Sequence, residues 1–414
     1  MGRRTGRPLI SRDEPSMAKR TLDQLDVNGK TVLVRVDFNV PIEQGAEFIA
    51  NYDHRLRATL PTIQYLVERK CQVVLCSHLG RPRGKIDDTL RLAPVGERLA
   101  TLLGRPVTPL DDCVGPEVAR AVGQMAPGDI CLLENLRFHE GEESNDETFA
   151  AQLAGLADCF VMDAFAVAHR AHASTVGVPR LLPTAMGLLT QREVESLGVA
   201  LENPARPLAA LMGGAKVSDK ILVLENLLTR LDHLFIGGGM AVTFLAAQGQ
   251  SVGASAVETD RLDFARDVIA RADAAGVVVH LPPDLVVASE FDPNPGSVDT
   301  VPVDAVPERW YIMDIGRNAA SAYASALADC RTILWNGPMG VFEMEQFSVG
   351  TRQVANGIAG LPDATTVVGG GSTAEAVEAL GLMERMTHVS TGGGASLEFL
   401  EGRVLPGIDA IPDA

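Results

Sequence analysis

Short apolar runs alternate with longer segments of helical periodicity along most of the chain. The runs at residues 31–38 and 71–77 are each followed by a helix-like segment, TLPTIQYLVERK and LAPVGERLATLLG. The apolar runs are nearly continuous rather than alternating with polar residues, which is typical of strands buried on both faces. The pattern therefore predicts βαβ units and an α/β fold with parallel sheets covered by helices.

The length and one amphipathic segment predict how the chain is divided. At 414 residues it exceeds the usual size of a single core. We expect two Rossmann-like doubly wound parallel-sheet domains, at 17–187 and 207–402, after a disordered extension at 1–16. Residues 188–206 read as a hinge helix that ends at Asn203 and Pro204, with Gln191, Arg192, Glu193 and Glu195 on its solvated side.

In the first half of the chain, polar side chains follow the predicted strands. They are Asp37, Asn39, His78, Arg81, Arg137, His169 and Arg170, and Arg55 opens the segment before a helix. Ligands of parallel α/β sheets bind beyond the carboxyl ends of the strands. Any one of these arginines, taken singly, reads as a solvated loop residue. Together, the guanidinium groups would repel one another without a compensating anion, and arginine suits phosphate or carboxylate recognition. We expect a site for a small polyanion.

In the second half, the strand ends are glycine clusters, at 213–214, 237–239, 337, 369–371 and 392–394. Such clusters let the backbone approach a ligand closely, and helix N-termini bind phosphates. Lys216 and Lys220 lie four apart after one cluster, so we expect both to face one phosphate chain. Ser372 and Thr373 are expected to cap a helix. A solvated helix face is the local alternative for the lysines. The five clusters together favour a nucleotide site, so we expect one ligand in each half.

The composition, and the absence of several known motifs, exclude a number of functional classes. The net charge of −17 and pI near 4.9 argue against a nucleic-acid or membrane-surface binder. No apolar stretch is long enough to span a membrane. The six cysteines form no CxxC pair, which favours buried reduced thiols and a cytoplasmic protein. The chain shows no Walker P-loop, GxSxG, HExxH or His/Cys metal spacing, and its glycine runs are no convincing dehydrogenase fingerprint. Phosphoryl transfer remains, since it requires mainly positioning and charge stabilisation.

Eight motifs in series carry a family resemblance. They are RVDFNVP, SHLGRP, LENLRFH, DAFAVAHRAHAST, GGAKVSDKI, IGGGMA, LWNGPMGVFE and STGGGASLEFLEG. In this order they resemble phosphoglycerate kinase, from about Met17 to the end of the chain. The resemblance implies reversible glycolytic phosphoryl transfer from 1,3-bisphosphoglycerate to ADP, giving 3-phosphoglycerate and Mg-ATP, by in-line transfer on domain closure. It also implies a monomer whose residues 403–414 return to the first domain.

The resemblance also assigns site residues, and it makes Arg55 and Lys216 the groups that neutralise the phosphoryl in transit. The implied 3-phosphoglycerate ligands are Asp37, Phe38, Asn39, Arg55, His78, Leu79, Gly80, Arg81, Arg137 and Arg170. The implied nucleotide ligands are Gly214, Lys216, Lys220, Gly316, Asn336, Glu343, Gly370, Gly371, Ser372 and Thr373.

The sequence departs from the family pattern at three places. Ser372 stands where the family has the aspartate that binds Mg²⁺, Ala166 and Val167 replace Gly-Thr, and Arg317 replaces a proline. A hydroxyl binds Mg²⁺ less well than a carboxylate, although Mg²⁺ often relies on water and substrate phosphates. We therefore leave the protein ligand of the metal open, with Glu375 as a candidate. Two hypotheses follow: an active kinase, or a degenerate paralog that binds the ligands but turns over poorly.

Overall fold

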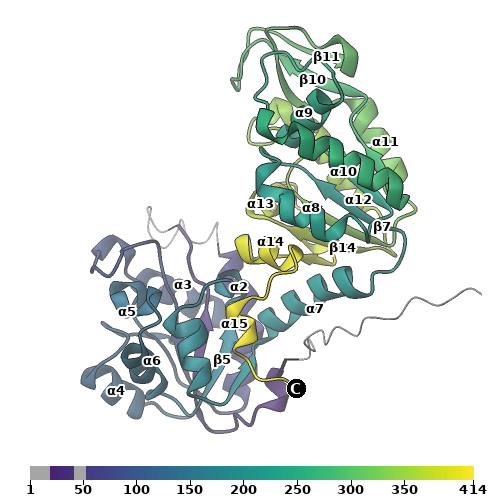
Figure 1. Ribbon diagram of the computed structural model, residues 1–414. Helices are drawn as coiled ribbons and strands as arrows, with labels where there is room; N and C mark the ends of the chain where they lie inside the picture. Colours follow the sequence, from purple (N-terminus) through teal and green to yellow (C-terminus); the bar gives the residue numbers. More distant parts are fainter. Residues whose placement is uncertain (1–18, 42–52) are drawn as a thin grey trace, which may run out of the picture.

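The computed structural model describes residues 19–41 and 53–414, and the predicted disordered extension 1–16 lies outside the described residues. Two six-stranded sheets, one in each half of the chain, form its framework (Figure 1). All strand pairs in both sheets are parallel. The prediction of two Rossmann-like α/β units is confirmed.

The first sheet has the strand order β3-β4-β2-β1-β5-β6. Its central strand is the apolar run TVLVRV, buried on both faces. The chain builds one side of the sheet from β1 to β4 and then crosses to place β5 on the other side of β1. This reversal puts a topological switch point between β1 and β5, where ligands of such sheets bind. The strands are β1 (Thr31–Val36), β2 (Gln72–Cys76), β3 (Thr108–Pro109), β4 (Ile130–Leu132), β5 (Cys159–Asp163) and β6 (Thr184–Met186).

Helices surround this sheet, and the longer ones bury an apolar stripe, as Val95 and Leu99 show in α3. They are α2 (His54–Glu68), α3 (Ala93–Leu103), α4 (Pro116–Gly123), α5 (Glu140–Glu143) and α6 (Glu147–Ala154). Short turns carry the strand ends that face the switch point. The turns used below are η3 (Leu136–Phe138), η4 (Phe165–Val167) and η5 (Ala173–Gly177).

The second sheet has the order β15-β14-β13-β7-β8-β9, with its switch point between β7 and β13. Its strands are β7 (Leu208–Met212), β8 (His233–Ile236), β9 (Val278–His280), β13 (Thr332–Asn336), β14 (Thr365–Gly369) and β15 (His388–Val389). The helices of this half are α8 (Ile221–Leu227), α9 (Gly238–Ala247), α10 (Leu262–Ala275), α11 (Arg317–Leu327), α12 (Val349–Ala359), α13 (Gly371–Ala379) and α14 (Gly394–Leu400).

A third, antiparallel sheet interrupts the second half, and the apolar pattern did not predict it. It has the order β11-β10-β12, from β10 (Asp284–Ala288), β11 (Val298–Pro302) and β12 (Tyr311–Ile315). Figure 1 shows β10 and β11 at the far end of the molecule from the first sheet. An apolar run indicates a strand but not its direction, which depends on tertiary pairing.

The helix α7 (Leu188–Glu202) connects the two sheets (Figure 1). Three backbone N–H groups at its start bond to the first half: Leu188 N to Thr62 Oγ1 (2.9 Å), and Leu189 N and Thr190 N to Asp163 Oδ1 (3.0 and 3.2 Å). Asp163, the last residue of β5, thus accepts hydrogen bonds from two N–H groups in the first turn of α7.

The expectation that Glu193 lies on the solvated side of this helix is wrong. Its carboxylate is fully buried and contacts the second half: His388 Nε2 at 2.7 Å, Thr391 N at 2.7 Å and Thr391 Oγ1 at 2.8 Å. Helical periodicity placed Glu193 beside other polar residues. Only the packing of α7 against β15 gives its carboxylate buried partners.

The end of the chain packs against the first half. Gly407 N donates to Ala168 O (2.8 Å), Arg20 N donates to Pro412 O (2.9 Å), and Lys19 pairs with Asp413 (2.9 Å). The last helix, α15 (Pro406–Asp409), lies in this stretch, and Figure 1 shows the C-terminus beside the first described residues. The chain thus crosses between the halves twice, at α7 and before α15.

The six cysteines are free and buried, as the sequence predicts. Within 19–41 and 53–414, every helix is too short or too polar to cross a lipid bilayer.

Candidate active site

A cavity of about 290 Å³ lies at the switch point of the first sheet. Its walls come from the ends of β1, β2, β4 and β5 and from the start of α2. The structure thus brings together most of the polar residues that the sequence assigned to an anion site. The lining residues are Asp37, Asn39, Arg55, His78, Gly80, Arg81, Arg137, Ala166, Val167, His169, Arg170 and the glycines 392–394.

The last three lining residues belong to the second half. Gly394 starts α14, and a Cβ built on it would lie 3.6 Å from His169 Nε2. A Cβ on Gly392 would lie 2.6 Å from the ring of Phe165, so this glycine permits close packing of the halves. This glycine cluster, which the sequence grouped with the nucleotide site, therefore lines the basic cavity.

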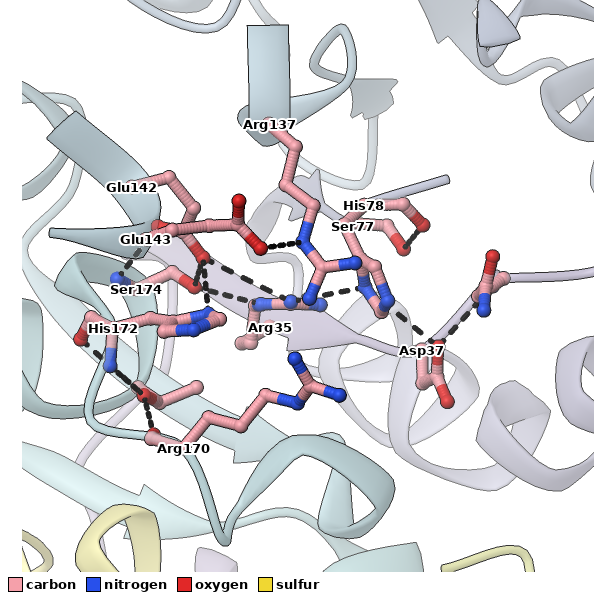
Figure 2. A network of polar contacts seen from close by, with 12 residues as sticks. Arg35, Asp37, Ser77, His78, Arg137, Glu142, Glu143, Arg170, His172 and Ser174 are labelled. Atoms are coloured by element: carbon pink, nitrogen blue, oxygen red, sulfur yellow. Dashed lines mark hydrogen bonds and ion pairs between the residues drawn. The ribbon is translucent and has the colours of Figure 1, made fainter. Parts of the chain in front are cut away.

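Carboxylates of the protein neutralise part of the arginine cluster. Arg55 pairs with Asp37. Arg137 Nε lies 3.2 Å from Glu143 Oε1 (Figure 2). From the sequence we expected a bound anion to compensate these guanidinium groups, but carboxylates of the protein supply part of the compensating charge. Glu143 was missed, although the acidic run that holds it begins three residues after Arg137.

The histidines of the cavity add no charge at neutral pH. Burial, followed by the nearby arginines, holds the pKa of His78 well below its usual range. The same causes lower the pKa of His172, just behind the cavity, to about 4, and burial lowers that of His169. Neutral imidazoles can still donate one hydrogen bond each to an anion.

Two arginines keep buried donors free for a ligand. Arg137 Nη2 and Arg170 Nε are buried and have no hydrogen-bond partner among the described residues. An unpaired buried donor on a charged group is costly, so a native protein rarely leaves it unsatisfied. The cavity therefore fits a small anion with several acceptor oxygens.

Two of the assigned residues do not reach this cavity. The side chains of Phe38 and Leu79 are buried in the apolar core of the first half. Their backbone contacts shape the site instead: Phe38 N donates to Ser77 Oγ (2.9 Å), and Leu79 N donates to Asn135 Oδ1 (3.2 Å). Asn39 Oδ1 in turn accepts a hydrogen bond from Gly80 N (2.9 Å).

A larger cavity, of about 550 Å³, lies between the second sheet and the antiparallel sheet. Of the assigned nucleotide residues, Gly214, Glu343 and Ser372 line it. Sequence reasoning missed most of its walls, because they are apolar residues of β10, of β12 and of the loop after β13. These missed residues include Leu285, Tyr311, Met313, Pro338, Met339 and Val341. An apolar cavity beside exposed backbone N–H groups suits a nucleoside with its phosphates outside.

The glycine clusters serve two purposes. Gly213, Gly239 and Gly337 pack backbone against backbone: a Cβ on each would lie within 2.1–2.4 Å of a carbonyl oxygen. By contrast, Gly371 has open space where a Cβ would lie, and Gly370 has φ +86°, which favours glycine. Close ligand approach therefore applies to the loop before α13 more than to the other clusters.

The two lysines do not share a helix face. Lys216 lies in the loop before the short turn η7 (Ser218–Lys220), so the expected i, i+4 spacing on one helix is wrong. Lys216 is exposed, whereas Lys220 is partly buried and burial lowers its pKa to about 8. Neither lysine lines the basic cavity or the larger cavity.

The remaining assigned residues lie around the larger cavity without lining it. Gly316 precedes α11, Asn336 ends β13, and Thr373 Oγ1 accepts a hydrogen bond from Gly337 N (2.7 Å). Ser372 and Thr373 lie inside α13, because Gly370 is the capping residue. The expected capping role of Ser372 and Thr373 is therefore wrong.

The larger cavity offers little to a metal ion. Asp314 lines it, but its carboxylate oxygens already accept from Gly350 N (2.7 Å) and Ile315 N (2.9 Å), and burial raises its pKa to about 7. In the described part of the chain, the one trio of His, Cys and Asp side chains close enough to share an ion is elsewhere, at Asp112, Cys113 and His139. Glu343, the other carboxylate that lines this cavity, is exposed.

Known proteins resemble this chain in both sequence and structure. A model of the family described as phosphoglycerate kinase matches residues 22–403. The phosphoglycerate kinase of Moorella thermoacetica is 56% identical over 397 residues, which cover 96% of this chain and all of that protein. That of Trichodesmium erythraeum is 51% identical over 401 residues, with the same coverage.

Two solved structures resemble the fold. The structure of phosphoglycerate kinase from Coxiella burnetii superposes with a TM-score of 0.84 at 43% identity, over 95% of this chain and 98% of that one. The structure from Pyrococcus horikoshii gives 0.81 at 32% identity, with the same coverage. The basic cavity, the apolar cavity and the sequence relatives together lead to one conclusion: the chain belongs to the phosphoglycerate kinase family.

Proposed function

We propose that the chain transfers a phosphoryl group between 1,3-bisphosphoglycerate and ADP by joining its two cavities. The observation that carries this proposal is the pair of unsatisfied buried donors, on Arg137 and Arg170, in a cavity beside neutral histidines. Such a site binds a phosphorylated carboxylic acid. The family is that of a phosphotransferase with a carboxyl acceptor, and nothing in the chain favours a degenerate paralog.

In this proposal, the basic cavity holds 3-phosphoglycerate. Arg137 and Arg170 donate to its oxygens, with Asp37, Asn39, His78, Gly80 and Arg81 around it, while Phe38 and Leu79 hold the strand ends in place. Arg55 is bound to Asp37 and only partly buried, so it can turn from that carboxylate to the phosphoryl in transit. Charge spreads over the three phosphoryl oxygens in the transition state, and a guanidinium group stabilises it.

We propose that the larger cavity holds the nucleotide, with the base against its apolar wall and Glu343 at the ribose. Gly214, Gly370 and Gly371 would approach the phosphates, while Lys220, Gly316, Asn336 and Thr373 would support the loops around them. Lys216 would meet the transferred phosphoryl from this side. Mg²⁺ enters as part of the nucleotide substrate, held by phosphate oxygens with Ser372 alongside. The protein's part in the reaction is to align the two substrates and to exclude water.

A coupled assay tests the reaction itself. We expect ATP consumption that depends on 3-phosphoglycerate and on Mg²⁺ at millimolar substrate concentrations. Turnover with neither dependence, or no turnover at all, would contradict the proposal.

The role of Lys216 can be tested separately because its side chain is exposed and its loss should not disturb folding. We expect Lys216→Met to lower kcat by about a hundredfold or more, as loss of a group that stabilises transition-state charge does. Lys70→Met removes an equally exposed lysine away from both cavities and is the matched control. A Lys216→Met enzyme with the kcat of the control would remove Lys216 from the catalytic groups.

We further infer a cytoplasmic monomer that binds neither nucleic acid nor membrane. Its acidic net charge of −17 and its buried free thiols support this inference. We also retain the proposed division into domains at 17–187, with 403–414, and 207–402, with 188–206 as the hinge.

A further inference from the structure

Behind the basic cavity lies a buried arginine to which neither the sequence motifs nor the proposed reaction gives a role. Arg35 is on β1, the central strand of the first sheet, and no part of it is exposed. A charged side chain in such a strand is costly to bury unless it is paired and hydrogen-bonded. Its partners therefore show what it is for.

The guanidinium group of Arg35 contacts two segments of the first half, Ser174 in η5 and His78 after β2 (Figure 2). Its Nε donates to Ser174 Oγ at 2.8 Å, Nη1 donates to Val36 O, and Nη2 lies 3.2 Å from His78 Nδ1. Of these contacts, only the one to His78 reaches a residue that lines the basic cavity.

Glu142 fixes the other end of this arrangement. Its Oε1 accepts from Ser174 Oγ at 2.6 Å and lies 4.0 Å from Arg35 Nη2, and its Oε2 accepts from Ser174 N at 3.0 Å. Glu142 is as fully buried as Arg35, so it supplies the compensating charge. Ser174 has a single hydroxyl hydrogen, which goes to Glu142, so its oxygen is free to accept from Arg35. Glu142, Ser174 and Arg35 thus form a chain of hydrogen bonds in which each donor and acceptor is defined. The chain ends at His78.

The chemistry of arginine decides the tautomer of His78. A guanidinium group stays protonated and has donors but no acceptor. The nitrogen that faces it, Nδ1, must therefore present its lone pair. The nearest alternative partner, Asp37 Oδ1, is 3.8 Å from Nδ1, which is too long for a hydrogen bond. Because burial and four arginines keep the ring neutral, its one N–H must be on Nε2.

We propose that the chain Glu142–Ser174–Arg35 is a positioning device that holds His78 as the neutral Nε2–H tautomer, ready to donate to an anionic oxygen in the basic cavity. Arg35 itself does not line that cavity. The use of the donated hydrogen bond rests on the proposed binding of 3-phosphoglycerate, but the tautomer does not.

The tautomer can be read in the ligand-free protein. We would label the full chain with ¹⁵N-histidine and record long-range ¹H–¹⁵N spectra at neutral pH, assigning His78 by the signals lost in His78→Gln. The expected result is one neutral form with the hydrogen on Nε2. A hydrogen on Nδ1, which would point to Asp37 as the partner, or a charged ring, overturns the proposal whatever the enzyme's activity.

Two variants then test the chain that sets the tautomer. Arg35→Met removes the donor, and we expect the His78 signals to change to a mixture of both tautomers. Since a hydrogen bond to a charged group is worth about 1.5–3 kcal/mol, the KM for 3-phosphoglycerate should rise about tenfold or more, with kcat and the nucleotide KM unchanged. Ser174→Ala keeps both charges and should produce a smaller change of the same kind.

Arg98→Met is the matched control. Arg98 also pairs with a buried carboxylate of the first half, Asp53, at 2.5 Å, but contacts neither His78 nor the cavity. We expect it to leave the His78 spectrum and the KM for 3-phosphoglycerate unchanged. If Arg35→Met fails to fold because Glu142 is left as an uncompensated buried charge, Ser174→Ala and the wild-type spectrum still decide. A wild-type tautomer that persists in Ser174→Ala, with an unchanged KM, would exclude Ser174 from the chain.

Discussion

Ser372 lies in the first turn of α13 and lines the larger cavity. Ser372 is exposed. The carboxylate of Asp314, which lines the same cavity, already accepts hydrogen bonds from two backbone N–H groups. At the residue scale, the cavity therefore offers few protein oxygens that are available as metal ligands. Asp163 is a second residue whose surroundings decide its behaviour. Its carboxyl group is buried, and its hydrogen-bond donors are two backbone N–H groups at the start of α7.

Ser372→Asp should lower the Mg²⁺ concentration needed for half-maximal activity and leave the KM for 3-phosphoglycerate unchanged. A carboxylate is a better ligand for Mg²⁺ than a hydroxyl, and a negative charge in the first turn of a helix is favourable. A Mg²⁺ titration of initial rates measures both effects. Glu375→Gln, three residues along the same helix, is the companion variant: if it alone shifts the titration, Glu375 is the protein ligand, contrary to this prediction.

Asp163 predicts a defined pH dependence of stability. Burial raises its folded pKa from 3.8 to about 6, so the folded state binds a proton more tightly than the unfolded chain does. The group's contribution is therefore most favourable below pH 4 and falls as the pH rises to about 6. Between pH values below 4 and above 6, this contribution to the free energy of unfolding should fall by about 3 kcal/mol.

Asp163→Asn removes that titration. Urea unfolding at pH 4, 5, 6 and 7 should show the variant gaining on the wild type as the pH rises, because only the wild type ionises a buried group. A constant difference between the two proteins across this range would contradict the raised pKa.

At the scale of elements, α7 is anchored to both halves of the molecule rather than exposed as a plain connector. Its first turn is bound to Asp163 and Thr62 of the first half, and Glu193 in its middle is bound to His388 and Thr391 of the second. The helix can therefore transmit a displacement of one sheet to the other. This mechanical link supports its proposed role as the hinge.

Glu193→Ala should destabilise the protein by about 3 kcal/mol, because it leaves the buried donors of Thr391 and His388 without an acceptor. Urea unfolding monitored by circular dichroism measures the loss. Glu195→Ala, two residues along the same helix, removes an exposed carboxylate and should cost less than about 0.5 kcal/mol. Equal effects of the two substitutions would mean that Glu193 does not hold α7 to the second half.

At the scale of the whole molecule, the two cavities lie on separate sheets, while the chain crosses between the halves at α7 and again before α15. A shared apolar cluster, in which Phe165 and Phe399 meet edge to face at 6.2 Å, joins them near the crossings. The glycines 392–394 already bring the second half to the edge of the basic cavity. Rotation about this joined region would bring the two substrates together.

X-ray scattering should show a smaller radius of gyration when 3-phosphoglycerate and a magnesium nucleotide are both bound than with either alone. Closure removes water, which would otherwise compete as a phosphoryl acceptor. The single-ligand samples are the controls. Identical dimensions in all samples would contradict closure and leave the two substrates apart.

The sequence by itself determined the class of fold and the different strand-end chemistry of each half. These properties follow from local patterns: continuous apolar runs indicate buried parallel strands, and the residue types at strand ends indicate the chemistry beyond them. Eight motifs in order then indicated the family. This is why the residues of the basic cavity, from Asp37 to Arg170, were foreseen almost completely.

Only the tertiary structure decided which charges meet and which side chains are buried. Glu142 and Glu193 look like ordinary surface acids in the sequence, but both are fully buried against residues distant in the chain. Glu142 pairs with Arg35, and Glu193 contacts His388 and Thr391. The apolar wall of the nucleotide cavity and the direction of β10, β11 and β12 depend in the same way on long-range packing. Burial and pairing are properties of contacts between elements, so no local pattern can contain them.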